Sequence, residues 1–154
     1  MNATRRSFFA LASGAFKALL LLSTLTMFSV PASAASFTPA DEKAVRTVVE
    51  GQLAAFAKDD ANKAFAYAAP NVREATGNAA SFLDMVKRGY PVVYRHTAVA
   101  FLKAEGKDDE VVQRVQLTDA DGASWLAIYT LERQKGKPWR ITGCQVVENK
   151  GRMA

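Results

Sequence analysis

Residues 110–148 read EVVQRVQLTDADGASWLAIYTLERQKGKPWRITGCQVVE, and this stretch decides the fold because its apolar residues recur with a period of two. Three strands are predicted within it, over residues 110–118, 124–133 and 139–148. Short polar connections with Asp-Gly and Lys-Gly steps separate them, which is typical of hairpin turns. The sequence therefore predicts consecutive antiparallel strands in this half of the chain.

Upstream of this stretch, the pattern predicts one more strand and, before it, helices. The strand is expected over residues 93–103, and Gly89 is expected to end the last helix in a left-handed conformation. Thr38-Pro39-Ala40-Asp41 has the cap, the proline and the acid of a helix start. Apolar residues at spacings of three and four predict helices over residues 39–56, 61–69 and 79–88.

Three N-terminal helices followed by a four-stranded antiparallel meander predict an α+β domain, with the helices packed on one face of a curved sheet. A sheet that curls around helices leaves a cavity, and ligand sites are usually concave and mostly apolar. We therefore expect any function of the fold to reside between helices and sheet.

The first 34 residues have the pattern of a cleavable signal peptide. Arg5, Arg6 and Lys17 precede an uncharged run of 13 residues, 18–30, and Pro31 and Ala32-Ser33-Ala34 follow it. A membrane-spanning helix takes roughly 20 residues, so a retained anchor is the weaker alternative. Cleavage is predicted between Ala34 and Ala35.

The expected destination is the periplasm, by either of two routes. Thr4-Arg5-Arg6-Ser7-Phe8-Phe9 resembles the twin-arginine export motif, although Ala10 stands where a basic residue often follows. General secretory signals also carry arginine pairs, so both routes stay open. The predicted organisation is a signal peptide over residues 1–34, one domain over residues 35–148 and a flexible tail over residues 149–154.

Removing the signal peptide changes the charge balance of the protein. The precursor carries a net charge of +5. Residues 35–154 hold 17 Lys and Arg against 15 Asp and Glu, which is +2. Nucleic-acid binding therefore loses its compositional support, and no nucleic-acid partner is expected. Cys144 is the sole cysteine, which excludes an internal disulfide and cysteine-based zinc sites.

Two glutamines alternate with apolar residues and are therefore expected to point inward. Gln113 shares a strand face with Val111 and Val115, and Gln52 lies one helical turn from Phe56. A buried amide without partners costs roughly 1–3 kcal/mol. The two either bind a polar group of a ligand or bond to the backbone and to each other. The predicted ligand pocket comprises Gln52, Phe56, Gln113 and Tyr129.

Residues for acid–base catalysis are few. His96 is the only histidine and the default general acid or base, and Asp84 is the carboxylate available to orient it. Tyr67 and Tyr94 complete the weak catalytic candidates. The alternative for His96 is a solvated residue near a strand end.

No metal site or cofactor is expected. Asp59-Asp60 and Asp108-Asp109-Glu110 lack the alternating ligands and central glycine of a calcium loop. Cys144 is expected on the opposite face of its strand from Ile141, as a packed or interface residue. Apolar residues on both faces of strand 124–133 predict cover on both sides, the second cover being a possible homodimer partner through the sheet.

Blocks of sequence spread over residues 41–147 resemble the family catalogued as domain of unknown function 4864. The family is similar in layout to the nuclear transport factor 2-like superfamily of cone-shaped domains. The blocks are Val45–Phe56, Asp59-Asp60, Ala64–Ala68, Phe82–Val86, Gly89-Tyr90-Pro91, Val111-Val112-Gln113, Asp119–Gly122, Leu131–Gln134 and Trp139–Cys144.

The resemblance implies a pocket between helices and sheet and often a dimer through the sheet, but it implies no single activity. No pair of titratable residues is visibly arranged for acid–base chemistry. The sequence therefore favours a non-enzymatic exported module that binds an unknown small molecule or protein. The alternative is a lyase, isomerase or hydrolase that uses acid–base residues in the pocket.

Overall fold

The computed structural model describes residues 36–136 and 138–151. The predicted signal peptide, its cleavage site and the end of the predicted tail lie outside these residues. Residues 149–151, the described part of that tail, form neither helix nor strand. No helix within the described ranges is long and apolar enough to cross a membrane.

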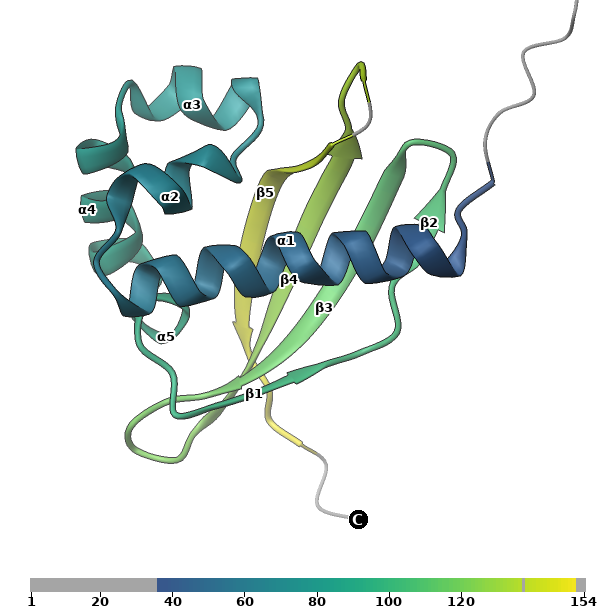
Figure 1. The fold of residues 1–154 in the computed structure, drawn as a ribbon. Coiled ribbons are helices and arrows are strands. Elements are labelled where there is room, and N and C mark those ends of the chain that lie inside the picture. Colours follow the sequence, from purple (N-terminus) through teal and green to yellow (C-terminus); the bar gives the residue numbers. More distant parts are fainter. Residues whose placement is uncertain (1–35, 137, 152–154) are drawn as a thin grey trace, which may run out of the picture. The chain divides into compact units, whose positions relative to one another are not determined.

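Helices come first in the chain and an antiparallel sheet follows, so the α+β class is confirmed (Figure 1). The sheet has the order β1-β3-β4-β5, and β2 also pairs with β3. The described elements are α1 (Pro39–Ala57), α2 (Ala61–Ala66), α3 (Pro70–Thr76), α4 (Ala79–Gly89), α5 (Pro91–Tyr94), β1 (Ala98–Phe101), β2 (Glu105–Lys107), β3 (Glu110–Thr118), β4 (Ser124–Arg133) and β5 (Trp139–Glu148).

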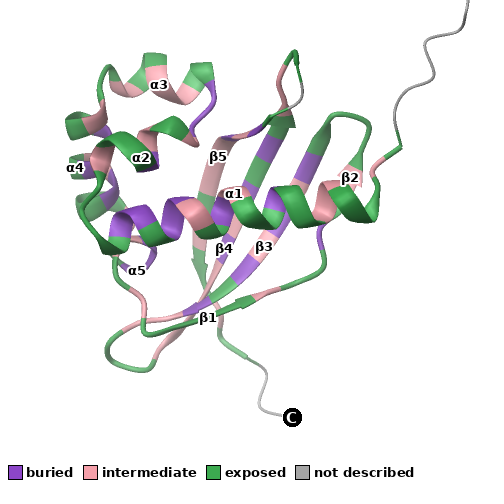
Figure 2. Ribbon diagram, viewed as in Figure 1, coloured by how far each residue is buried: buried purple, intermediate pink, exposed green. Residues whose placement is uncertain are grey.

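Helix α1 begins where its sequence predicts. The Thr38 side chain accepts a hydrogen bond from the Asp41 N–H at 3.2 Å, and the Asp41 carboxylate accepts one from the Thr38 N–H at 2.9 Å. This capping box satisfies two amides that the first helical turn leaves without partners. The apolar face of α1, with Val45, Val49 and Phe56, is buried against the sheet (Figure 2).

Two helices were not predicted, and each begins at a proline. Pro70 starts α3 and Pro91 starts α5, because proline fits the first helical position, where no N–H partner is needed. The predicted strand 93–103 is therefore wrong at its start. Of the predicted strand, only Ala98–Phe101 forms a strand, β1. A further short strand, β2, lies beyond its predicted end, and β1 and β2 pair with opposite halves of β3.

The ends of two predicted helices also differ. Gly89 is the last residue of α4 and does not have a positive φ, so the predicted left-handed cap is wrong. Helix α2 ends at Ala66 instead of Ala69, because the backbone of residues 67–69 bonds to β5. Ile141 N–H donates to Tyr67 O at 2.9 Å, and Ala69 N–H donates to Ile141 O at 2.8 Å.

Strands β3, β4 and β5 have the predicted bounds and antiparallel pairing. In β3, Val111, Gln113, Val115 and Leu117 are buried and alternate with more exposed residues, which confirms the predicted register. The β3–β4 turn is held by Asp119, whose carboxylate accepts hydrogen bonds from the Ala123 N–H and the Trp125 indole. Helix α1 lies across the face on which these buried side chains gather (Figures 1 and 2).

A β-bulge in β5 changes which side chains face the helices. Thr130 pairs with Gly143 and Leu131 pairs with Ile141, so Thr142 is an extra residue on β5. Strict alternation placed Cys144 and Ile141 on opposite faces, and that prediction is wrong. The bulge resets the alternation, so Cys144 pairs with Tyr129 and both Ile141 and Cys144 pack toward the core.

The opposite face of β4 carries Leu126 and Ile128, which are partly exposed. They alternate with Ala127 and Tyr129, which are buried under the helices. The predicted homodimer contact on this second face stays a prediction.

Candidate functional site

A cavity of about 340 Å³ lies between the helices and the inner face of the sheet. Its walls come from α1, α3, α4, α5 and the paired strands β4 and β5. The volume is at the lower end of the range of about 300–1,000 Å³ that ligand sites occupy. Among the lining residues are Gln52, Phe56, Met85, Val93, Tyr129 and Cys144.

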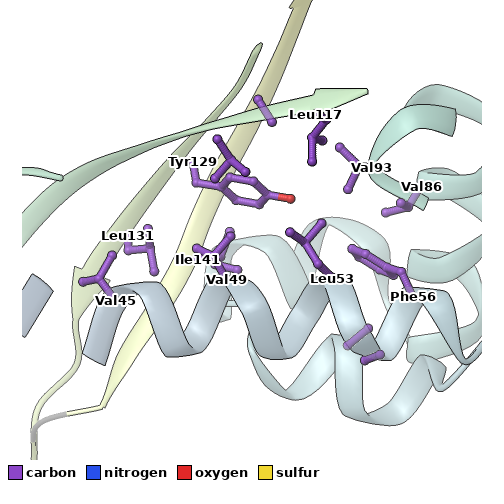
Figure 3. Close-up of a cluster of buried hydrophobic side chains, with 14 of the residues drawn as sticks. Val45, Val49, Leu53, Phe56, Val86, Val93, Leu117, Tyr129, Leu131 and Ile141 are labelled. Carbon is purple, nitrogen blue, oxygen red and sulfur yellow. The ribbon is translucent and has the colours of Figure 1, made fainter. Parts of the chain in front are cut away.

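Tyr129 places a buried polar atom in the cavity wall. Its side chain is 1% exposed, and its ring packs among apolar residues of α1, α4 and α5. Figure 3 shows the hydroxyl pointing away from β4 toward Val86 and Val93. This hydroxyl has no hydrogen-bond partner among the described residues. A buried hydroxyl without a partner costs roughly 1–3 kcal/mol.

Cys144 lies beside Tyr129 because the two are paired across β4 and β5. The thiol makes a long contact, 3.9 Å, to the carbonyl oxygen of Gln145 and also interacts with the Tyr129 hydroxyl. Burial raises the pKa of Cys144 to about 12. Burial, followed by the nearby Cys144, raises the pKa of Tyr129 well above its usual value. Both groups therefore keep their protons at neutral pH, and the thiol is a poor nucleophile.

The cavity carries no formal charge. No Asp, Glu, His, Lys or Arg occurs among the described residues that line it. Gln52 is 3% exposed and donates a hydrogen bond from Nε2 to Ala64 O at 3.2 Å. Its carboxamide oxygen takes no part in this hydrogen bond. The arrangement can bind a neutral group by hydrogen bonding, but it has no acid–base pair.

The wall formed by α3 is tied to the bulge of β5. Asn71 Nδ2 donates to Thr142 O at 2.9 Å, next to the backbone bonds between residues 67–69 and Ile141. The backbone groups of Ile141 and Thr142 at the bulge thus find hydrogen-bond partners in the connection from α2 to α3 and in α3 itself. These bonds fix α3 at the edge of the cavity.

The structure brings Gln52, Phe56 and Tyr129 together but places Gln113 elsewhere. Gln113 is 1% exposed and donates from Nε2 to Leu102 O at 2.7 Å and to Arg114 O at 2.9 Å. Its carboxamide therefore joins β3 to the chain that follows β1. Two alternatives were predicted for the buried glutamines, a ligand contact or hydrogen bonds within the protein. Gln113 forms hydrogen bonds to the backbone.

Replacing Gln113 with leucine is expected to lower the free energy of unfolding by about 1–3 kcal/mol, because the carbonyl of Leu102 then loses its donor inside the protein. Urea unfolding of the two proteins measures the change. Gln116→Leu, at an exposed position of the same strand, is the control and should change stability by less than about 0.5 kcal/mol. Equal stability of Gln113→Leu and the wild type would contradict the structural role.

The catalytic candidates are scattered, and none of them lines the cavity. Asp84 is exposed on α4, and Tyr67 packs over Gly51 of α1. His96 lies between α5 and β1, outside the strand in which it was expected. Burial lowers its pKa, and no hydrogen bond joins it to Asp84 or to a tyrosine among the described residues.

Tyr94 belongs to a surface cluster centred on Asp59, which has a positive φ of 55° after α1. The Tyr94 hydroxyl donates to Asp59 at 2.5 Å, and Lys87 and Arg95 approach the same carboxylate at 3.1 and 2.9 Å. The Tyr94 hydrogen bond, then Lys87 and Arg95, lowers the pKa of Asp59 to about 2. Asp59 therefore joins the end of α1 to α4 and α5.

Asp59→Asn is expected to destabilise the protein at neutral pH and to lose this effect in acid. The pKa of Asp59 is depressed in the folded state. The contribution of this carboxylate to stability is therefore fully present at pH values above its ordinary pKa of 3.8 and disappears as the pH falls toward 2. Melting temperatures of both proteins between pH 7 and pH 2 test this. A melting-temperature difference that stays constant across this range would contradict the assignment.

A larger depression of about 1140 Å³ lies beside β2 and the neighbouring ends of β3 and β4. It is more open to solvent than the cavity around Tyr129. Its charged side chains, including Glu105, Lys107 and Glu132, are exposed. No buried polar atom without a partner was found among its described lining residues, so it lacks the feature that distinguishes the smaller cavity.

Among the described residues, no group of three or more His, Cys, Asp or Glu side chains is placed to hold a metal ion. Sequence reasoning missed Cys144 as a lining residue, because the extra residue Thr142 shifts its face. It also missed the contribution of α3. The proline at residue 70 was the available signal, since proline is favoured at the first position of a helix.

Comparison with known proteins identifies the family. The chain belongs to the family described as a domain of unknown function (DUF4864), which matches residues 38–154. No curated protein matches. Among solved structures, the chain is similar to an NTF-2-like protein of unknown function from Silicibacter pomeroyi DSS-3. The identity is 14%, the TM-score is 0.47, and the match covers 69% of this chain and 93% of the other.

Proposed function

We propose that this protein is an exported periplasmic module that binds a small molecule in the cavity around Tyr129. The observation that carries the proposal is the Tyr129 hydroxyl, which is buried in the cavity wall without a partner among the described residues. A bound molecule that forms this hydrogen bond offsets the cost of burying the hydroxyl. The surrounding apolar side chains supply the remaining contact.

Binding is favoured over catalysis by the chemistry of the lining. Acid–base catalysis requires groups whose pKa values are near the working pH. The Tyr129 hydroxyl and the Cys144 thiol have raised pKa values and hold their protons. The histidine and carboxylate candidates, His96 and Asp84, lie outside the lining.

The proposal is tested by purifying the protein from its native periplasm and identifying co-purified molecules by mass spectrometry. Ala75 lies at the exposed edge of the cavity on α3, so Ala75→Trp should fill the entrance and abolish co-purification. Ala80→Trp adds the same side chain at an exposed position of α4 that does not line the cavity, and it should retain the molecule. Equal recovery from all three proteins, or no recovery from the wild type, would contradict the proposal.

Export is tested separately. Sequencing the N-terminus of periplasmic material should give Ala35 or a residue within a few positions of it. Recovery of the intact Met1 form from the cytoplasm would contradict export. Replacing Arg5 and Arg6 by lysine should block export only if the twin-arginine route is used.

A further inference from the structure

We propose that the ligand is an uncharged, largely apolar molecule that presents one hydrogen-bond acceptor, such as a carbonyl oxygen, to the Tyr129 hydroxyl. The inference rests on the proposed function and adds the chemical class of the ligand. Three features of the cavity carry it: the absence of charge in the described lining, the side-by-side placement of two protonated groups, and the mostly apolar remainder of the wall. Other polar residues of the lining are Gln52, Asn71, Thr76 and Thr142.

The first feature excludes charged ligands. A carboxylate or ammonium group in a cavity without a compensating charge would lose its hydration and gain no ion pair. The lining residues in the described part of the chain include no basic or acidic side chain. The charged cluster of Lys87 and Arg95 is already occupied by Asp59 and is on the surface.

The second feature sets the polarity of the recognised group. Tyr129 and Cys144 are paired across neighbouring strands, and the Tyr129 hydroxyl interacts with the Cys144 thiol. Both hold a proton, and beyond its weak interaction with the thiol the hydroxyl has no hydrogen-bond partner among the described residues. A hydroxyl proton is a good donor and a thiol proton a weak one. A ligand acceptor atom placed here meets the stronger donor at Tyr129.

The third feature describes the rest of the ligand. Phe56 and Phe82 lie with ring centroids 5.8 Å apart, and both line the cavity. Met85, Val86 and Val93 continue the apolar wall on α4 and α5. Burying apolar carbon of a ligand against such a surface favours binding by about 25 cal/mol per Å² of apolar area removed from water. An aromatic or alicyclic body bearing one carbonyl group fits both parts of the cavity.

The test uses three probes of matched shape: acetophenone, which has a carbonyl acceptor; cumene, which has none; and benzoate, which is an anion. Binding to the mature protein is followed by NMR titration of backbone amides around the cavity. Acetophenone should bind more tightly than cumene, and benzoate should not shift these amides. Tyr129→Phe should weaken acetophenone about tenfold and leave cumene unchanged, as expected for the loss of one hydrogen bond.

Tyr129→Phe should fold normally, since the lost hydroxyl has no partner among the described residues; its melting temperature in the absence of ligand should equal or exceed that of the wild type. Tyr67→Phe, which alters a tyrosine outside the cavity, should leave the affinity for acetophenone unchanged. Equal affinity of acetophenone for wild type and Tyr129→Phe, or tight binding of benzoate, would overturn the inference while leaving the cavity a binding site. If neither acetophenone nor cumene shifts the amides around the cavity, the proposed function itself fails.

Discussion

Phe56→Ala is expected to lower the free energy of unfolding by about 3–5 kcal/mol, the range for removing a buried aromatic ring. Phe56 is 1% exposed and packs against Phe82 at 5.8 Å between ring centroids. It joins α1 to α4 beside the cavity, so its loss enlarges a space that the helices can close only by shifting toward each other. Urea unfolding monitored by circular dichroism measures the change.

Phe101→Ala is the matched control for this experiment. Phe101 lies in β1, is only partly buried and is covered on one side by Arg46. Its removal should cost clearly less than that of Phe56, at most about 2 kcal/mol. Similar losses for the two variants would mean that Phe56 does not belong to the principal core.

The second large effect is expected at Arg133 of β4. This residue contacts Asp41, which lies at the opposite end of α1 from Phe56. Its guanidinium lies 2.8 Å from Asp41 and 3.0 Å from Asp109, and it covers the ring of Trp139. The Arg133 and Asp41 side chains are only 21% and 13% exposed, so the pair is largely shielded from water.

Arg133→Ala should therefore lower the free energy of unfolding by roughly 2–3 kcal/mol. This is less than the cost of breaking a fully buried pair, because some solvent still reaches the guanidinium. Arg46→Ala removes the exposed pair with Glu50, whose side chains are 56% and 47% exposed, and should cost at most about 0.5 kcal/mol. Urea unfolding of both variants checks the contrast, and equal losses would refute it.

The sequence predicted most reliably those elements whose own pattern determines their structure. The strands from residue 110 onward and the start of α1 follow from alternation and capping, and both are confirmed. The burial of Gln52 and Gln113 also followed from periodicity. What periodicity could not predict was their partners, because Leu102 O and Ala64 O are brought to them only by the folded chain.

The parts that were wrong depend on tertiary contacts. Residues 67–69 leave the helical pattern because β5 offers them backbone hydrogen bonds. Cys144 reaches the cavity because Thr142 is an extra residue in its strand, and nothing in the local alternation indicates that residue. The site around Tyr129 was therefore predictable in part, from the inward face of β4, whereas its second wall was not.

A crystal structure of the protein soaked with acetophenone tests the central claim most directly. The account predicts that the ketone occupies the cavity between α1, α4 and the sheet, with its oxygen within hydrogen-bond distance of the Tyr129 hydroxyl, about 2.5–3.0 Å. It also predicts an aromatic ring against Phe56 and Phe82. A soaked crystal in which the ketone binds only elsewhere, or in which Tyr129 bonds to ordered water alone, would contradict it.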